Sequence, residues 1–238
     1  MNNDRTKKLA ELQEKLSYSF RDPERLSTAL THRSYVNENP QTGGEDNERL
    51  EFLGDAVLGL CVSDLLMKKY PDFDEGTLSK IRSSLVNEKP LASLASQLGL
   101  GDCLLLGRGE EHSGGRAKES LLANALEAVI AAIYLDSGFS KVKTLLRRLM
   151  KPLMKDEAIA AQYPDYKTAL QEICQKKYKT APIYTLLAES GPEHEKIFEM
   201  EVVIGDDIRH IGRGRSKKEA QKQAAQKAWE SLHGENGT

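Results

Sequence analysis

The chain has 238 residues, of which 39% are hydrophobic and 29% are charged, and its formal net charge is −2; this allows one large or two ordinary domains with a buried core. The segment from Met1 to Leu12 is polar and no apolar run approaches the roughly 20 residues needed to cross a bilayer, so we expect neither a secretory signal nor a membrane span. Three widely spaced cysteines, Cys61, Cys103 and Cys174, argue against a disulfide framework or a zinc site and favour a cytoplasmic protein.

The first part of the chain is predicted to be an all-helical domain covering residues 1–154. Pro23 suits the first turn of a helix, Thr77 is an expected N-cap, and Gly99 is an expected helix end. Loops are expected at 37–46 and 104–115, where glycine and proline accumulate. The predicted helices cover residues 7–16, 23–31, 47–70, 77–87, 89–98, 118–137 and 140–154.

The helix predicted at 47–70 carries an acidic ridge. Glu48, Glu51 and Asp55 stand at positions i, i+3 and i+7, which places them on one face. Three like charges within two turns destabilise a helix unless a cation offsets them, and a divalent metal prefers such hard oxygen ligands. The apolar residues of the other side, which we expect to be buried, are Leu50, Leu53, Val57, Leu60 and Cys61.

An aromatic residue shares this acidic face. At roughly 100° per residue, Phe52 lies about 40° from Glu48 on the helical wheel. It can pack against a neighbouring loop, or it can insert into a partner subunit, and we favour the partner.

A second acidic segment follows at residues 121–128, where Asn124 and Glu127 share a face at i, i+3. Packing this helix antiparallel to the first would bring Glu51, Asp55, Asn124 and Glu127 together as an oxygen-lined Mg²⁺ site. A metal-bound water there could attack phosphorus without a histidine base. Taken alone, each acidic pair is better interpreted as a solvated helix face.

The hydrophobic period changes in the second part of the chain. Residues 155–164 are small and polar and form the predicted linker. Residues 165–238 form a small α+β domain of order α-β-β-β-α, with Ser216 capping the last helix. Its elements are expected at 166–177, 183–190, 196–204, 208–214 and 217–232.

Three motifs in the first part resemble those of the ribonuclease III family. They are Asn47-Glu48-Arg49-Leu50-Glu51-Phe52-Leu53-Gly54-Asp55, Asp74-Glu75-Gly76 and Leu122-Ala123-Asn124-Ala125-Leu126-Glu127-Ala128, in the family's order and spacing. The resemblance extends from about residue 9 to about residue 232. It implies a helical endonuclease domain that forms a homodimer, with Mg²⁺ (or Mn²⁺ as a substitute) at each of two sites.

The resemblance also implies roles for individual residues. Phe52 is expected at the dimer interface. Asn124 departs from the more familiar aspartate; its amide oxygen can still bind a metal, but without charge, and we favour a working variant over a weakened site. The implied metal ligands are Glu51, Asp55, Asn124 and Glu127, and the implied catalytic residues are Asp55, Glu127, Glu48 and Glu75.

The second domain resembles a double-stranded-RNA-binding domain. Seven Lys/Arg stand between Arg209 and Lys227 against one acid, Glu219, and form a predicted basic stripe. Duplex RNA is recognised by shape, through 2′-hydroxyls and phosphates, so small polar groups and a lysine-rich helix start suit it. A solvated helix face is the alternative. The expected RNA-binding residues are Thr168, Gln171, Glu172, Pro192, His194, Ser216, Lys217, Lys218 and Lys222.

The resemblance therefore implies a bacterial-type endoribonuclease that hydrolyses double-stranded RNA. It would leave 5′-phosphate and 3′-hydroxyl ends with short 3′ overhangs, and process ribosomal-RNA precursors and structured messengers. One alternative is a non-cleaving double-stranded-RNA-binding regulator, if Asn124 disables the metal site. Another is a structural RNA-associated dimer in which the acidic ridge is an interface and metal is irrelevant.

Overall fold

The structure, a computed structural model, describes residues 3–71, 73–154, 165–205 and 207–234. The chain folds into two compact units, Met1–Ile159 and Ala160–Thr238. The predicted linker, residues 155–164, lies outside the described residues, so the exact domain bounds stay a prediction.

The first unit is helical, as predicted, and two 3-10 turns, η1 (Pro40–Thr42) and η2 (Gly115–Ala117), interrupt its loops. Its α-helices are α1 (Asn3–Leu16), α2 (Pro23–Ala29), α3 (Arg33–Glu38), α4 (Glu48–Lys69), α5 (Glu75–Leu85), α6 (Glu88–Leu98), α7 (Leu100–Cys103), α8 (Arg108–His112), α9 (Glu119–Ser137) and α10 (Phe139–Met150).

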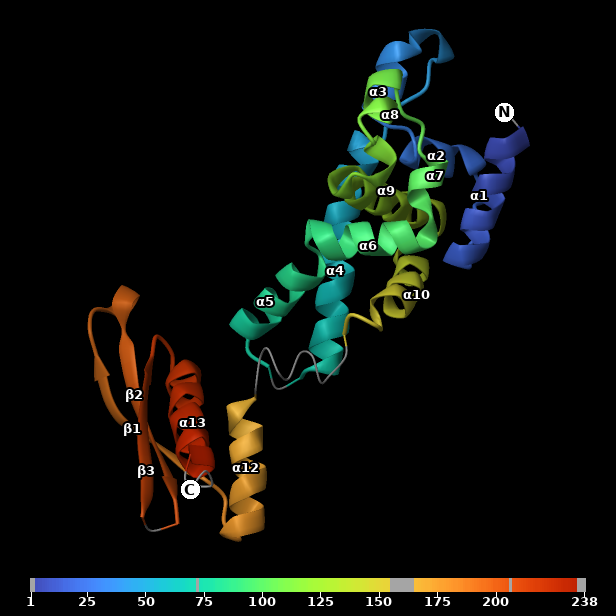
Figure 1. Cartoon of the computed structure of the whole chain (residues 1–238). Helices are drawn as coiled ribbons and strands as arrows, with labels where there is room; N and C mark the ends of the chain where they lie inside the picture. Colours follow the sequence, from blue (N-terminus) through green and yellow to red (C-terminus); the bar gives the residue numbers. More distant parts are fainter. Residues whose placement is uncertain (1–2, 72, 155–164, 206, 235–238) are drawn as a thin grey trace. The chain divides into compact units, whose positions relative to one another are not determined.

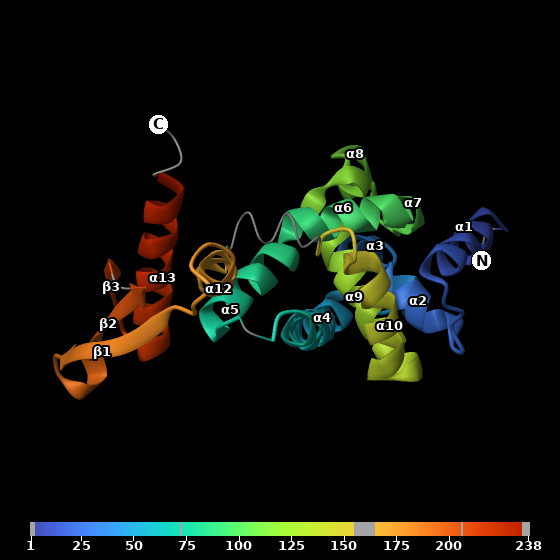
Figure 2. The same ribbon diagram turned by 90° about the horizontal axis from the view of Figure 1, so that it is seen from below.

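Helix α9 forms the centre of this unit. It packs against α2, α4, α6 and α10, which surround it in Figures 1 and 2. Every side chain from Ala128 to Ile133 is fully buried. The segment from Ala128 to Ile133 is apolar on every side, and such a segment must be covered on every side. This explains why other helices pack around this part of α9.

By length and composition α9 is also the one helix in the described part of the chain that could cross a membrane. The expectation concerned uninterrupted apolar runs, and in α9 such a run is broken by charged residues such as Glu127. Burial explains why α9 has such an apolar sequence, because 56% of its most apolar stretch is buried inside the unit. That pattern is shown by helices at the centre of a folded domain.

A glycine allows α4 and α9 to approach at the level of their backbones. A Cβ atom on Gly54 would lie 1.9 Å from the carbonyl oxygen of Glu127, so any side chain there would force the helices apart. The start of α4 is held by Asn47, whose Nδ2 donates to the Ala29 carbonyl and whose backbone N–H donates to the Thr31 carbonyl. The acidic turns of α4 and α9 are thereby fixed side by side.

Three local expectations for this unit are corrected. The N-cap of α5 is Asp74, whose carboxylate accepts from the Thr77 N–H at 2.7 Å, and Thr77 itself lies inside the helix. The segments expected as loops contain short helices, with α3 entering the first and α8 lying in the second. Leu60 was expected in the core but is 60% exposed, although Val57 and Cys61 are buried as predicted.

The second unit has the predicted α-β-β-β-α order, with a 3-10 turn, η3 (Glu193–Glu195), between its first two strands. The sheet is antiparallel in the order β1-β2-β3, and Tyr184 pairs with Val202, which pairs with His210. Both helices lie on one face of the sheet (Figure 2). The elements are α12 (Tyr166–Lys177), β1 (Ile183–Ser190), β2 (Ile197–Ile204), β3 (Ile208–Gly214) and α13 (Lys217–Gly234).

A stripe of small residues lets α13 lie close to the sheet. The buried alanines of this stripe face β3, where a Cβ on Gly212 would lie 2.2 Å from the Ala220 carbonyl oxygen. Leu170, Cys174 and Val202 complete the core. All three cysteines of the chain are free and buried, as expected.

Candidate active site and RNA-binding surface

Helices α4 and α9 together line an open hollow of about 470 Å³. The close approach at Gly54 brings the two predicted acidic segments to opposite walls of this hollow. The four residues predicted as metal ligands all line it. The complete lining is Glu48, Glu51, Phe52 and Asp55 from α4, and Asn124 and Glu127 from α9.

Four carboxylates concentrate negative charge in the hollow. Burial, together with the neighbouring carboxylates of Asp55 and Glu51, raises the pKa of Glu127 to about 7. The pKa of Glu51 is also raised, first by burial and then by Glu48, while a hydrogen bond from the Asn124 amide acts in the opposite direction. Both shifts therefore come first from burial of the carboxylates and then from the like charges beside them.

The side chains line the walls of the hollow and do not converge on one point. Among the described residues, no three His, Cys, Asp or Glu side chains gather closely enough to hold a metal ion in their present positions. The donor chemistry nevertheless suits a hard divalent cation, since every polar group in the lining offers an oxygen. Such a cation would offset both the burial of Glu127 and its repulsion by Asp55 and Glu51, the two causes of its raised pKa.

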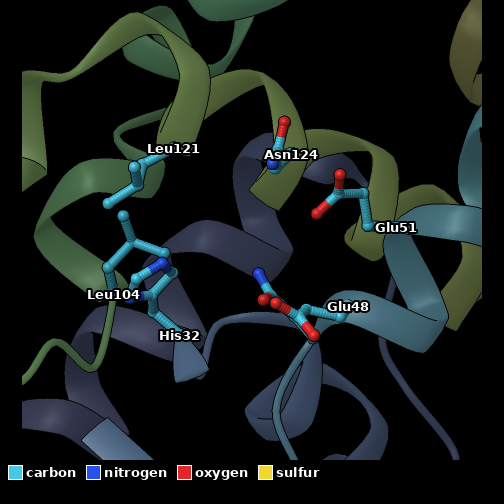
Figure 3. A pocket seen from close by; sticks show the side chains of 7 residues that line it. His32, Glu48, Glu51, Leu104, Leu121 and Asn124 are labelled. Carbon is cyan, nitrogen blue, oxygen red and sulfur yellow. The ribbon is translucent and has the colours of Figure 1, made fainter. Parts of the chain in front are cut away.

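A smaller cavity of about 50 Å³ adjoins the hollow and shares Glu48, Glu51 and Asn124 with it. Figure 3 shows His32 and Leu104 on one side of this cavity and Glu51 and Asn124 on the other. His32 is the N-cap of α3 and accepts from the Ser34 N–H. His32 was not among the predicted site residues, because α3 has no buried residue and hence no apolar stripe that would mark the helix His32 caps.

Glu75 does not line the acidic hollow of its own chain. It lies at the start of α5, accepts a hydrogen bond from the Ser79 hydroxyl at 2.9 Å, and borders a separate groove of about 370 Å³. Phe52 stands at the rim of the acidic hollow and is 82% exposed. The groove beside Glu75 is lined by Ser63, Leu66, Met67, Glu75, Leu78, Ser79 and Arg82.

The three predicted RNA-binding segments lie at the same end of the second unit (Figure 1). Lys167 on the first turn of α12 donates to Gln221 on α13 at 2.9 Å. Glu189 joins the other two segments, because it pairs with Lys196 beyond the β1–β2 loop and with Lys217 on α13, both at 3.0 Å. Neither Lys167 nor Lys196 was among the predicted residues.

Each predicted RNA-binding segment presents exposed side chains. Gln171, Glu172 and His194 are exposed, and the Thr168 hydroxyl donates to Asp165, the N-cap of α12. At the start of α13, Ser216 caps the helix by accepting from the Glu219 N–H, as predicted. The remaining exposed residues of this group are Pro192, Lys217 and Lys218, while Lys222 is half-buried.

The predicted basic stripe between Arg209 and Lys227 is not one surface. Arg209 and Arg213 on β3 pair with glutamates of β2, and Lys227 donates to the Ile211 carbonyl. At the start of α13, Lys217 instead pairs with Glu189, next to the β1–β2 loop. The basic residues that are close together in the sequence are therefore separated in the structure, some lying on β3 and others on α13.

The chain is similar to known proteins over both units. A family described as Ribonuclease-III-like matches residues 22–153, and one described as Double-stranded RNA binding motif matches residues 166–232. A protein named Ribonuclease 3 from Syntrophobacter fumaroxidans is 49% identical over 92% of this chain and 93% of its own length. Ribonuclease 3 of Borreliella burgdorferi is 45% identical over 98% of this chain and 95% of its own length.

Solved structures match the first unit. A nuclease domain of ribonuclease III from Campylobacter jejuni, described as flexible in the region involved in dimer formation, superposes with a TM-score of 0.56. It is 46% identical and covers 60% of this chain and 96% of its own length. A second structure of that domain has the same TM-score, 43% identity, and covers 69% and 98% of the two chains.

Proposed function

The chain belongs to the ribonuclease III family and is a double-strand-specific endoribonuclease, and we propose that it hydrolyses the RNA backbone at the acidic hollow with the help of Mg²⁺. The observation that supports this site is the set of four carboxylates and one amide on two helices around one hollow. Mn²⁺ is expected to substitute, because it has the same preference for oxygen ligands.

Glu51, Asp55, Asn124 and Glu127 are the residues proposed to hold the metal. When bound, the metal would polarise a phosphoryl oxygen and lower the pKa of a bound water. Without a cation these carboxylates repel a phosphodiester, since nothing in the lining carries positive charge. Asn124 orients Glu51 through its amide N–H, and in the metal-free chain the pKa of Glu127 is raised to about 7 by burial and by Asp55 and Glu51.

We further propose that two copies pair through the exposed face of α4. Phe52, Leu60 and Met67 are 82%, 60% and 65% exposed and lie within one side of the helix. A two-fold axis near Leu60, which lies midway between the other two, would place Phe52 of one copy at Met67 of the other. Met67 borders the groove beside Glu75, so this groove is the proposed socket for Phe52.

Such a dimer would give Glu75 a place in catalysis. Within one chain Glu75 is remote from the acidic hollow, but Phe52 borders that hollow and would insert next to the partner subunit's Glu75. Each cutting site would then combine the hollow of one copy with an acid from the other. Two such sites in one dimer would cut one strand each, leaving short 3′ overhangs and 5′-phosphates.

The second unit is proposed to hold the duplex through the starts of α12 and α13 and the β1–β2 loop. Residues 166–232 match the double-stranded RNA binding motif, and the three segments lie at one end of the unit. Helix N-termini with lysines suit phosphates, and small polar side chains suit 2′-hydroxyls. Ribosomal-RNA precursors and structured messengers as substrates, and a cytoplasmic location, stay predictions.

The test compares Glu127→Gln with Glu119→Gln, an exposed glutamate on the same helix that does not line the hollow. End-labelled duplex RNA is incubated with each variant in Mg²⁺ and in chelator. We expect Glu127→Gln to lose at least about 100-fold in cleavage while binding RNA normally, and Glu119→Gln to behave like the parent. Normal cleavage by Glu127→Gln would show that the hollow is not the cutting site.

The same assay tests the non-cleaving alternative, which is not favoured because the chain is closely related to proteins named Ribonuclease 3. Binding without cleavage by the parent protein in Mg²⁺ would support that alternative. Asn124→Asp would then ask whether one further carboxylate restores cutting. Equal cleavage in Mg²⁺ and in chelator would instead contradict the metal-dependent mechanism.

A further inference from the structure

A cation at the rim of the acidic hollow has no role in the function proposed so far. Arg33, the first residue of α3, donates from Nη1 to Glu48 Oε1 at 2.7 Å. Within the described ranges, this is the only ion pair that reaches any of the four carboxylates lining the hollow. Glu48 borders both the hollow and the smaller cavity, so the guanidinium lies at the edge of both.

The guanidinium has unused hydrogen-bonding capacity. Among the described residues it makes this one hydrogen bond, and Nε and Nη2 are left for another partner. The Arg33 side chain is 60% exposed and that of Glu48 is 51% exposed. Ion pairs this exposed contribute little to stability, so another anion can displace Glu48 easily. The planar fork of arginine matches two oxygens of a phosphate particularly well.

The backbone that carries Arg33 is held on both sides. His32 accepts from the Ser34 N–H, and the Ser34 hydroxyl accepts from the Gly107 N–H at 2.9 Å. At the other end of α3, Glu38 accepts from the Arg108 N–H at 2.8 Å. A change of partner by Arg33 therefore requires only a side-chain movement, and the helix can stay in place.

We propose that Arg33 binds a backbone phosphate of the RNA next to the cutting site, and that Glu48 occupies this position until RNA arrives. The proposal rests on the nuclease function proposed above. On binding, the Arg33–Glu48 pair breaks, an Arg33–phosphate pair forms, and the Glu48 carboxylate is released toward the hollow. A negatively charged backbone approaching four carboxylates needs such a cation at the point of entry.

The experiment measures duplex-RNA affinity of the full chain in chelator, where cleavage does not interfere, over a range of salt concentrations. Each lost phosphate contact lowers the slope of log affinity against log salt by up to about 0.9. Arg33→Ala should therefore weaken binding and lower the slope by about 0.9, or about twice that if both copies of a dimer contact the RNA. Arg33→Lys should keep the slope. The matched control is Lys8→Ala, which breaks a 2.8 Å pair with Asp4 on α1 at a lysine that is 43% exposed.

A second variant distinguishes phosphate binding from a merely positional role. Glu48→Gln frees the guanidinium and should tighten binding in chelator, and adding Arg33→Ala should abolish that gain. An unchanged affinity and salt slope in Arg33→Ala would overturn the proposal, even if cleavage fell, because Arg33 would then only orient Glu48. A parent protein that fails to cut in Mg²⁺ would contradict the nuclease function, while the chelator measurements would still decide the role of Arg33.

Discussion

Replacing Gly54 by alanine is the sharpest test of the close packing between α4 and α9. The new Cβ would lie 1.9 Å from the Glu127 carbonyl oxygen and 2.4 Å from its carbon, both backbone atoms that cannot rotate away. Ordinary van der Waals contact begins at 3.4 Å, so the helices would have to separate locally by about 1.5 Å.

The expected cost follows from two opposing effects. Alanine favours a helix over glycine by about 1 kcal/mol, whereas overpacking a well-packed core costs about 1–3 kcal/mol and occasionally more. Because the clash is with backbone, we expect the overpacking cost to be at or above the upper figure, leaving a net loss of about 2 kcal/mol or more. For a unit of this size, that corresponds to a Tm lower by about 4–8 °C. The carboxylates would also be displaced, and a misplacement of about 1 Å can lower catalysis about 100-fold.

Calorimetry of the full chain is the suitable assay, because the second unit provides an internal reference if it unfolds separately. Gly109→Ala is the matched control: it replaces a helical glycine of α8, and its Cβ would meet nothing within 4 Å. That variant should raise Tm slightly through helix propensity. If Gly54→Ala unfolded and cleaved RNA like Gly109→Ala, the close backbone approach described for these helices would be wrong.

Three further predictions use the same assays. The pKa of Glu127 is raised from 4.5 to about 7 in the folded chain, so the folded state binds this proton more tightly than the unfolded state does. The metal-free protein should therefore lose stability as pH rises from about 4.5 to about 7, and thermal melts in chelator should show the Tm falling over this range. An equal fall in the Tm of Glu127→Gln would assign the loss to another group. Phe52→Ala should dissociate the dimer in analytical ultracentrifugation. The control Leu135→Ala, at a residue of α9 that is 46% exposed, should remain dimeric. A dimeric Phe52→Ala would exclude the groove beside Glu75 as the binding site of Phe52. Gly212→Ala places a Cβ 2.2 Å from the Ala220 carbonyl oxygen. This variant should lower the Tm of the second unit by several degrees and weaken RNA binding, without changing the Tm of the first unit. An unchanged Tm of the second unit would contradict the close packing of α13 on β3.

Periodicity predicted most of the helices and strands, and it failed where long-range backbone contacts decide the ends. The bounds expected for α12, β1 and β3 agree with the structure, because their apolar residues repeat regularly. Helix α2 ends at Ala29 rather than Thr31, because Leu105 hydrogen-bonds with Leu30 and His32 and occupies that backbone. Helix α3 has no buried residue and hence no apolar stripe to detect.

The site was predictable to the extent that helical spacing fixes it. Glu51 and Asp55 share a face wherever α4 packs, and the same is true of Asn124 and Glu127 on α9, so their meeting required only that the two faces touch. The position of Glu75 depends on the direction in which α5 leaves α4, and no spacing within α5 encodes that direction. The Arg33–Glu48 pair spans 15 residues and a turn, and it was missed for the same reason.

The burial of α9 also determines how the site responds to thermal fluctuations. Backbone amides exchange with solvent through openings that range from local fraying to global unfolding, and a helix segment whose side chains are all buried can open only with the whole unit. The amides of Ala128 to Ile133 should therefore exchange at the rate set by global unfolding of the nuclease unit. Glu127 is attached directly to this slowest-exchanging segment, whereas Arg33 stands on a short surface helix with no buried residue. Deuterium would thus enter around Arg33 long before it reaches the backbone directly after Glu127.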